Sequence, residues 1–182
     1  MQPESTRRLF FALWPDPDLA RLLERRLPAQ LPPVDGRKLG PGQWHVTLEF
    51  LGSVRESRLG ELFDLASGVA GSAFAIEFDR LEYWRRPQVL CLGSSQIPKA
   101  LLDLVNALRA ALTGRDFRTD RRDFRPHVTV ARKVRHPPAA GPFEVLRWPA
   151  RAFSLVESVT DLAGAIYRPL MSWPLRETRK PG

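Results

Sequence analysis

Two short motifs in this sequence carry residue types that suit acid–base chemistry. His45 is followed two places later by Thr47, and His127 is followed in the same way by Thr129. An imidazole with a pKa of about 6.5 can both donate and accept a proton near neutral pH. The two histidines therefore predict general acid–base catalysis, in which one takes a proton from a nucleophile and the other protonates a leaving group.

The repetition of the motif makes it informative. A single His-x-Thr is a weak signal, because a surface histidine on a sheet fits it equally well. The threonine hydroxyls could bind anionic oxygens, or they could reflect only the preference of threonine for strands. The third histidine, His136, lacks a threonine partner and precedes Pro137 and Pro138. We expect His136 in a surface loop outside the site.

Both motifs lie in segments whose hydrophobic pattern is typical of half-buried strands. Alternate side chains of a strand share one face, so His and Thr of each motif are expected opposite the core. Strict alternation also places Glu49 on the face of His45, as an orienting or a solvated carboxylate, and Arg132 on the core face unless the strand ends there. The residues expected on the core face are Trp44, Val46, Leu48, Phe50, Val128 and Val130.

The remaining pattern supplies elements that position these strands. Apolar spacing predicts a helix after Pro17, and further helices over 56–69 and 98–112. A hairpin-like pair is expected over 74–84 and 89–92. Single strands are expected over 8–14, 153–159 and 165–173.

The order strand, helix, loop and motif strand occurs twice, at an offset close to that between His45 and His127. This repetition predicts an α+β fold of two duplicated α/β lobes, with mostly antiparallel sheets around a central cleft and a pseudo-twofold relation. Each lobe is too small to fold alone, so we expect residues 1–182 to form a single bilobal domain.

Composition narrows the function classes. The formal net charge of +8 comes with 24 Arg against 4 Lys; it favours polyanionic partners, or it reflects a compositional bias alone. Cys91 is the only cysteine, which excludes an intrachain disulfide and a thiolate metal cluster. No apolar run approaches the roughly 20 residues that cross a bilayer, so we expect a cytoplasmic protein.

These residues resemble the two-histidine (2H) phosphoesterases, whose signature is two His-x-Thr/Ser-x motifs, each ending in a hydrophobic residue, in duplicated lobes. Within that superfamily the chain is most similar to the bacterial and archaeal RNA 2′,3′-cyclic phosphodiesterases, also called LigT-like or 2′-5′ RNA ligases. The resemblance covers most of the chain and is carried by 8–13, 48–52, 125–132, 155–158 and 167–175.

The resemblance implies opening of 2′,3′-cyclic phosphate ends on RNA to 2′-phosphomonoesters, together with reversible 2′-5′ joining of ends. It implies His45 as proton donor and His127 as proton acceptor, with Thr47 and Thr129 binding the phosphate oxygens. No cofactor and no metal are expected, since the sequence has no His-Glu-x-x-His and no carboxylate or cysteine cluster. The expected partner is RNA, with tRNA fragments among the substrates, and the expected state is a monomer that does not bind membranes.

Several assignments stay open between two roles. Arg125 and Arg132 could bind phosphate or be solvated, and the arginines of 115–125 could bind RNA or pair with the interleaved aspartates. Hydrolysis of small cyclic phosphates or 2′-5′ oligonucleotides, and RNA binding without catalysis, are the alternative functions. The aromatic residues that could stack on a base, or belong to the core, are Phe10, Phe11, Trp84 and Tyr167.

Overall fold

The computed structural model describes residues 4–120, 122–139, 141–161 and 164–177. Its β-strands are β1 (Thr6–Leu13), β2 (Arg37–Lys38), β3 (Val46–Arg55), β4 (Phe74–Phe78), β5 (Arg80–Trp84), β6 (Val89–Gly93), β7 (His127–Arg132), β8 (Leu146–Ala150), β9 (Ala152–Asp161) and β10 (Gly164–Pro174). Its α-helices are α1 (Pro17–Gln30), α2 (Leu59–Ser67) and α3 (Lys99–Thr113), and single 3-10 turns occur at Pro41–Gln43 and Glu56–Arg58.

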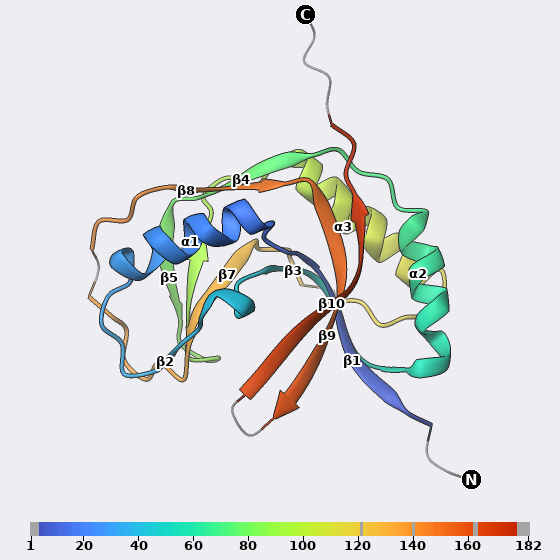
Figure 1. Ribbon diagram of the computed structural model, residues 1–182, viewed down its shortest axis with the longest axis horizontal. Coiled ribbons are helices and arrows are strands. Elements are labelled where there is room, and N and C mark those ends of the chain that lie inside the picture. Colours follow the sequence, from blue (N-terminus) through green and yellow to red (C-terminus); the bar gives the residue numbers. More distant parts are fainter. Residues whose placement is uncertain (1–3, 121, 140, 162–163, 178–182) are drawn as a thin grey trace, which may run out of the picture.

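The strands form one long sheet and one small one. The order of the long sheet is β10-β9-β1-β3-β7-β6-β5, with β2 added beside β7, while β4 and β8 pair separately. Every pair of neighbouring strands within these sheets is antiparallel. The centre of the long sheet is narrow, because β3 and β7 meet only at Val46 and Val128. The sheet therefore divides into two lobes joined at the motif strands (Figure 1).

The two lobes are related by the predicted pseudo-twofold. The run β1–α1–β3 is matched by β6–α3–β7, and the motif residues Val46 and Val128 occupy equivalent places in the two motifs. These equivalent residues face each other across an antiparallel pair, as a twofold axis between the strands requires. The predicted α+β fold with duplicated lobes and mostly antiparallel sheets is confirmed.

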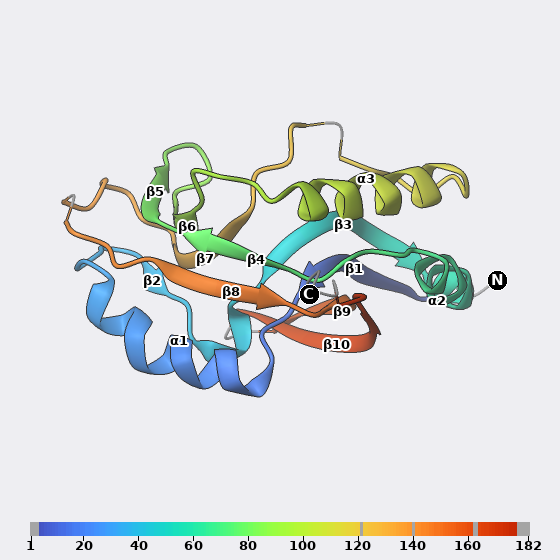
Figure 2. The same ribbon diagram turned by 90° about the horizontal axis from the view of Figure 1, so that it is seen from above.

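Helices α1 and α3 each pack on the lobe opposite to that of the strand they follow. Figures 1 and 2 show α1 over the lobe of β5, β6 and β7, although it follows β1, and show α3 beside α2 on the opposite side. Helix α3 follows β6 and yet contacts β3. Helix α1 begins where the Asp16 carboxylate accepts a hydrogen bond from the Leu19 amide at 2.8 Å. Leucines at 19, 23 and 27 then bury one face of the helix.

The motif strands both bulge at the fourth residue of the motif, and strict alternation is wrong beyond that point. Leu48 is skipped in the pairing of β3 with β1, and the equivalent Val130 is skipped in the pairing of β7 with β6. An extra residue in one strand reverses the faces that follow it. Phe50, expected in the core, is consequently 42% exposed, and Glu49, expected outward, is 2% exposed. Arg132, expected on the core face, is exposed.

Other boundaries differ from the expected ones for local reasons. The strand expected over 74–84 breaks at Asp79, so that β4 pairs with β8 and only β5 forms the hairpin with β6. The helix expected over 56–69 opens with a 3-10 turn and ends before Gly68. Strands β2 and β8 were not predicted; β8 is short and contains Pro149, which argues against a strand in a sequence pattern.

Candidate active site

Each motif histidine is held by the backbone just ahead of its own strand. The Nδ1 of His45 lies 2.8 Å from the carbonyl oxygen of Gln43, and the Nδ1 of His127 lies 2.9 Å from the carbonyl oxygen of Arg125. A carbonyl can only accept, so Nδ1 carries the hydrogen in both rings. In the neutral imidazoles Nε2 is therefore the nitrogen with a free lone pair, and it is the atom available for proton transfer to a ligand.

His45 lies in an aromatic enclosure. Its ring stacks on Trp14 with centroids 5.6 Å apart and planes 11° apart, and it lies 4.9 Å from the ring centroids of Phe10 and Tyr167. This burial lowers the pKa of His45 to about 4; the Gln43 carbonyl opposes the shift, whereas positive charge on His127 and Arg132 adds to it. In the ligand-free protein His45 is consequently neutral at pH 7.

His127 has fewer aromatic neighbours than His45 among the described residues. The Trp84 ring lies against it with centroids 4.6 Å apart. Burial lowers the pKa of His127, while the Arg125 carbonyl and the Glu82 carboxylate oppose the shift and Arg132 adds to it. Because Arg132 acts on the pKa of both rings, its guanidinium lies within electrostatic reach of the two imidazoles together.

We expect the two rings to make the fold sensitive to acid. The folded pKa of His45 is about 4, below its ordinary 6.5, so unfolding takes up a proton as the pH falls from 6.5 towards 4. Urea unfolding of wild type should therefore give a free energy of unfolding that declines over this window, and His45→Gln should flatten the decline. An equal decline in both proteins would contradict the assignment, and NMR titration of the rings gives the midpoints directly.

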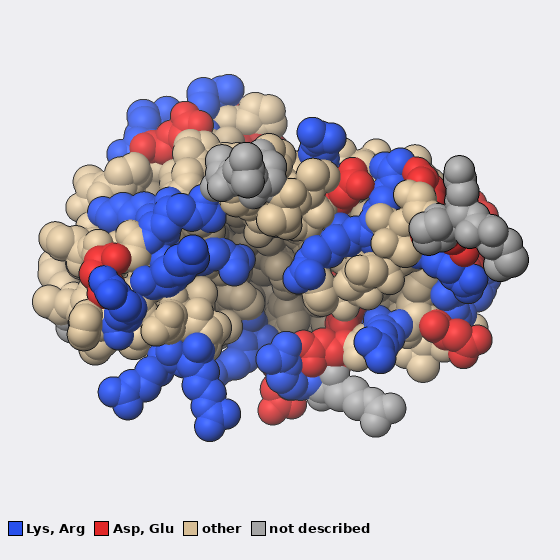
Figure 3. Space-filling view, turned by 90° about the horizontal axis from the view of Figure 1, so that it is seen from below, with Lys and Arg blue, Asp and Glu red and all other residues tan. Residues whose placement is uncertain are grey.

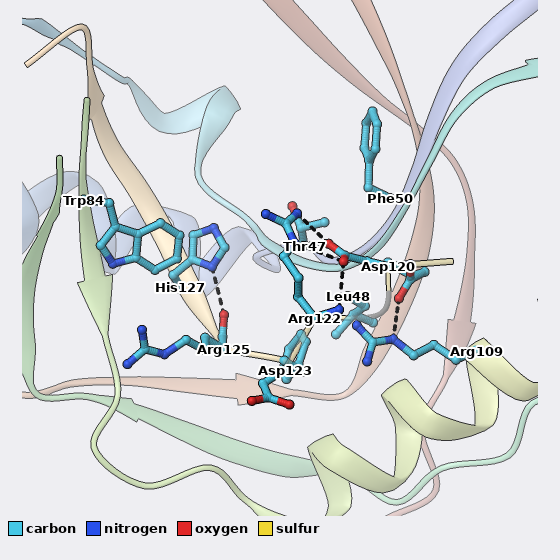
Figure 4. A pocket seen from close by; sticks show the side chains of 12 residues that line it. Thr47, Leu48, Phe50, Trp84, Arg109, Asp120, Arg122, Asp123, Arg125 and His127 are labelled. Carbon is cyan, nitrogen blue, oxygen red and sulfur yellow. Dashed lines mark hydrogen bonds and ion pairs between the residues drawn. The ribbon is translucent and has the colours of Figure 1, made fainter. Parts of the chain in front are cut away.

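Two cavities flank the paired histidines and share Thr47 and Phe50 between them. One has a volume of about 530 Å³ and contains His127; the other has a volume of about 430 Å³ and contains His45. Figure 4 shows the first, with Trp84 beside His127 and Arg122 turned towards Asp120. Its lining is Thr47, Leu48, Glu49, Phe50, Trp84, Arg109, Asp120, Arg122, Asp123, Phe124, Arg125 and His127. The lining of the second is Arg8, Phe10, Arg37, His45, Thr47, Phe50, Arg132, Ser158, Thr160, Ala165 and Tyr167.

The sequence-predicted partners divide between these cavities. Thr47 lines both, Arg125 lines the cavity of His127, and Arg132 lines that of His45. Thr129 is not among the described residues that line either cavity; its Oγ1 lies 3.9 Å from the Sγ of Cys91. Burial raises the pKa of the Cys91 thiol to about 12, so that thiol stays protonated and does not act as a nucleophile at neutral pH.

Glu49 is a buried carboxylate that lines the His127 cavity, and the sequence did not predict that it would hold a neighbouring segment in place. Glu49 accepts a hydrogen bond from Nε of Arg109 on α3 at 2.7 Å and another from the backbone N–H of Asp120. Asp120 in turn pairs with Arg122 at 2.6 Å, which lowers the pKa of Asp120 to about 2. Glu49 therefore anchors the segment that leads to His127 and does not contact an imidazole through any described hydrogen bond.

The arginine-rich connection shows pairing within the chain. Arg122 pairs with Asp120, and Arg115 lies 3.8 Å from Glu61. Arg121 lies outside the described residues. Arg125 is exposed on the rim of the His127 cavity.

The aromatic candidates separate into core and site. Phe11 is fully buried in the core, whereas Phe10 and Tyr167 pack against His45 and Trp84 packs against His127. His136 is exposed and lies 2.9 Å from Asp35, as its predicted loop position implied. Trp14 was not singled out in the sequence, because nothing in a strand pattern shows which ring will stack on which.

The described residues contain neither a candidate metal-binding cluster nor a candidate membrane-spanning helix. The described segments contain no group of three or more His, Cys, Asp and Glu side chains that could hold a metal ion. No helix in the described part of the chain is long and apolar enough to cross a membrane.

The comparisons with known proteins establish the family. A family model for the 2′-5′ RNA ligase superfamily matches residues 15–161, and the chain belongs to that superfamily. The RNA 2′,3′-cyclic phosphodiesterase of Escherichia coli K12 is 28% identical over 173 residues, which cover 94% of this chain and 98% of that protein. The protein of the same name from Archaeoglobus fulgidus is 30% identical over 176 residues, which cover 90% and 97%.

Solved structures agree with this assignment. The crystal structure of E. coli LigT complexed with 3′-AMP has a TM-score of 0.83 and 28% sequence identity, and the match covers 94% of this chain and 99% of that one. The crystal structure of TT0787 of Thermus thermophilus has a TM-score of 0.76 and 25% identity, with 93% and 98% covered. The resemblance that the sequence motifs indicated is thus confirmed.

Proposed function

We propose that this protein opens 2′,3′-cyclic phosphate ends of RNA to 2′-phosphomonoesters, with His45 and His127 as the acid and the base and without a metal ion. The carrying observation is the paired geometry of the two imidazoles, which are held through Nδ1 at equivalent places of two symmetry-related strands. The names of the relatives and the shared superfamily support the substrate class.

The mechanism assigns one proton transfer to each ring. The Nε2 of His127 takes a proton from water while the water oxygen forms a bond to phosphorus. The bond from phosphorus to the 3′ oxygen breaks as the Nε2 of His45 gives that oxygen a proton. Two rings from opposite lobes suit an in-line displacement, in which nucleophile and leaving group lie on opposite sides of phosphorus.

The environment of His45 fits the donor role. A ring whose pKa lies at about 4 is a stronger acid when protonated than a free imidazole. A cyclic phosphate bound beside it carries a negative charge, which favours the imidazolium and so supplies the proton. The hydroxyl of Thr47 and the guanidinium groups of Arg132 and Arg125, which line the two cavities, would stabilise the negative charge that develops on the non-bridging oxygens. Thr129 is assigned the same role from its place in the second motif alone, because it is not among the described residues that line either cavity.

The proposal also covers the domain organisation, the location, the oligomeric state and the RNA substrates of the protein. We take the two lobes to act as a single domain, because α1 and α3 each cross to the opposite lobe. We also take the protein to work as a cytoplasmic monomer on tRNA fragments among other RNA ends, with joining as 2′-5′ linkages as the reverse reaction. The net charge of +8 supports a polyanionic substrate.

The test is turnover of an oligoribonucleotide that ends in a 2′,3′-cyclic phosphate, measured with and without EDTA. We expect equal rates in the two buffers and a product that carries its phosphate only on the 2′ oxygen. Loss of activity in EDTA that added divalent metal restores would overturn the metal-free mechanism. A 3′-phosphate product would reverse the leaving group, and with it the roles of His45 and His127.

A further inference from the structure

The two imidazoles differ in what holds their rings. His45 packs against three aromatic rings, whereas Trp84 is the one aromatic ring that contacts His127 among the described residues. The hydrogen bond from Nδ1 to the Arg125 carbonyl fixes only one atom of the His127 ring, so the ring can still tilt about that bond. The direction of Nε2, the atom that exchanges a proton, therefore depends on the position of Trp84.

Trp84 receives little support from the sheet. It is the last residue of β5, which is an edge strand of the long sheet, and a turn follows it. Its ring is half-buried and lines the cavity of His127 (Figure 4). Its Nε1 donates a hydrogen bond to the carboxylate of Glu82 at 3.0 Å. Glu82 and Trp84 lie two places apart in one strand, so their side chains share a face of the sheet and the carboxylate can fix the indole.

The carboxylate of Glu82 is itself held in place. Its other oxygen accepts a hydrogen bond from Nε of Arg80 at 2.8 Å. It lies over Gly93 of β6, which pairs with Arg80 on one side and with His127 on the other. A Cβ at Gly93 would be only 2.5 Å from Oε1 of Glu82. The residue opposite His127 is therefore one that leaves space for this carboxylate.

The charge of Glu82 also reaches His127. Burial opposes the ionisation of Glu82, but the two hydrogen bonds that its carboxylate accepts lower its pKa. Burial lowers the pKa of His127, while the Arg125 carbonyl and the charge of Glu82 raise it and Arg132 lowers it further. The carboxylate is thus within electrostatic reach of the imidazole.

Binding of the substrate does not explain a carboxylate at this place. Glu82 is not among the described residues that line either cavity. Figure 3 shows a hollow at the centre of one face with Lys and Arg side chains around its rim, which suits an anionic substrate. A carboxylate would repel such a substrate, so Glu82 needs a role other than contact with it.

We propose that Glu82 is a positioning residue for the general base: it holds the Trp84 indole against His127 and so keeps Nε2 of the imidazole directed at the attacking water. The inference rests on the proposed function, because that function makes His127 the group that receives the proton. Glu82 acts through Trp84 and does not take up the proton itself. His45 needs no such residue, because three rings already enclose it.

The experiment changes the carboxylate in three ways. Glu82→Leu removes both the acceptor and the charge. Glu82→Gln removes the charge but keeps an oxygen that can accept from the indole. Gly93→Ala pushes the carboxylate out of its place without changing it, and so keeps the proposal testable if Glu82→Leu does not fold. For each variant we would measure kcat and KM on a cyclic-ended oligoribonucleotide, the NMR titration midpoint of His127, and nuclear Overhauser contacts between the rings of Trp84 and His127.

In Glu82→Leu we expect kcat to fall about tenfold with KM almost unchanged, because misplacement of a reacting group by about 1 Å can cost up to about 10²-fold. The ring contacts should weaken. The His127 midpoint should move to lower pH, since a charge that raises its pKa is gone. Glu82→Gln should lower the midpoint equally but keep most of the kcat and the ring contacts. Gly93→Ala should follow Glu82→Leu in kcat and in the ring contacts.

The matched controls are Glu77→Leu, which changes an exposed glutamate on β4 that lines neither cavity, and Gly60→Ala, whose added Cβ meets nothing within 4 Å. Both should behave as wild type. Unchanged kcat in Glu82→Leu would overturn the positioning role and leave the proposed function standing. An equal loss of kcat in Glu82→Gln and Glu82→Leu would overturn it too, in favour of the charge alone. Absence of turnover by wild type would overturn the proposed function and the positioning role with it, and it differs from the other two outcomes because in those wild type is active.

Discussion

Replacing His127 with alanine is expected to lower kcat for opening a cyclic-ended oligoribonucleotide by about 10²- to 10⁴-fold, the range for removal of a general acid or base. His45→Ala should have an effect of similar size. Each ring supplies a proton transfer, and the thiol of Cys91 cannot replace it, since its raised pKa keeps it protonated. The double variant should be little worse than either single one, because acid and base act in one step.

The control for these variants is His136→Ala. His136 is exposed, pairs with Asp35 outside both cavities, and should leave kcat unchanged. Thermal unfolding shows whether the motif variants keep the fold, which we expect because truncation of a half-buried ring leaves the hydrophobic strand positions in place. If either motif variant kept more than about a tenth of wild-type kcat, that histidine would not be the acid or the base.

The duplicated fold could be predicted because its evidence is local and occurs twice. Strand alternation around His45 and His127, each preceded by a helix pattern, recurs at one offset in the sequence, and antiparallel pairing of Val46 with Val128 is the physical form of that repetition. The swapped positions of α1 and α3 could not be predicted in this way. They depend on which lobe each helix packs against, and hydrophobic periodicity shows a buried face without naming its partner.

The bulges at Leu48 and Val130 explain most of what the sequence pattern missed in the site. In a regular strand, side chains alternate between the two faces with a period of two. A bulge reverses the faces of the residues that follow it, and it is defined by pairing with the neighbouring strand, which the sequence pattern does not show. The bulge at Leu48 directs Phe50 towards the cleft, and the bulge at Val130 directs Arg132 towards it. Because the two motifs bulge at the same place, the failure of alternation is itself a consequence of the duplication.

The role of Glu49 depended on partners far away in the chain. Arg109 and Asp120 are 60 and 71 residues distant, and a single sequence holds no signal that joins them. The buried carboxylate is tolerated because it accepts hydrogen bonds from both, as a charge removed from water must. The pairing of Arg122 with Asp120, in contrast, followed from the interleaved charges of the segment, since the two residues lie only two places apart.

Arg132→Ala is expected to lower kcat by about 10²- to 10³-fold, the usual cost of removing one group that stabilises developing charge on an oxyanion. The bulge at Val130 places the guanidinium in the cavity of His45, where it lies within electrostatic reach of both rings. Arg132→Lys should recover only part of the rate, because an ammonium group cannot make the paired contacts of a guanidinium to phosphate.

A second readout separates this role from a merely structural one. Arg132 lowers the pKa of His45 and of His127, so its removal should raise both NMR titration midpoints, whereas Arg132→Lys, which keeps the charge, should leave them nearer to wild type. Arg135→Ala is the matched control, since Arg135 is an exposed arginine three residues further on that pairs with Asp35. Unchanged kcat with unchanged midpoints in Arg132→Ala would remove Arg132 from the site, while a lower kcat with unchanged midpoints would place its charge too far from the imidazoles to bind the same phosphate.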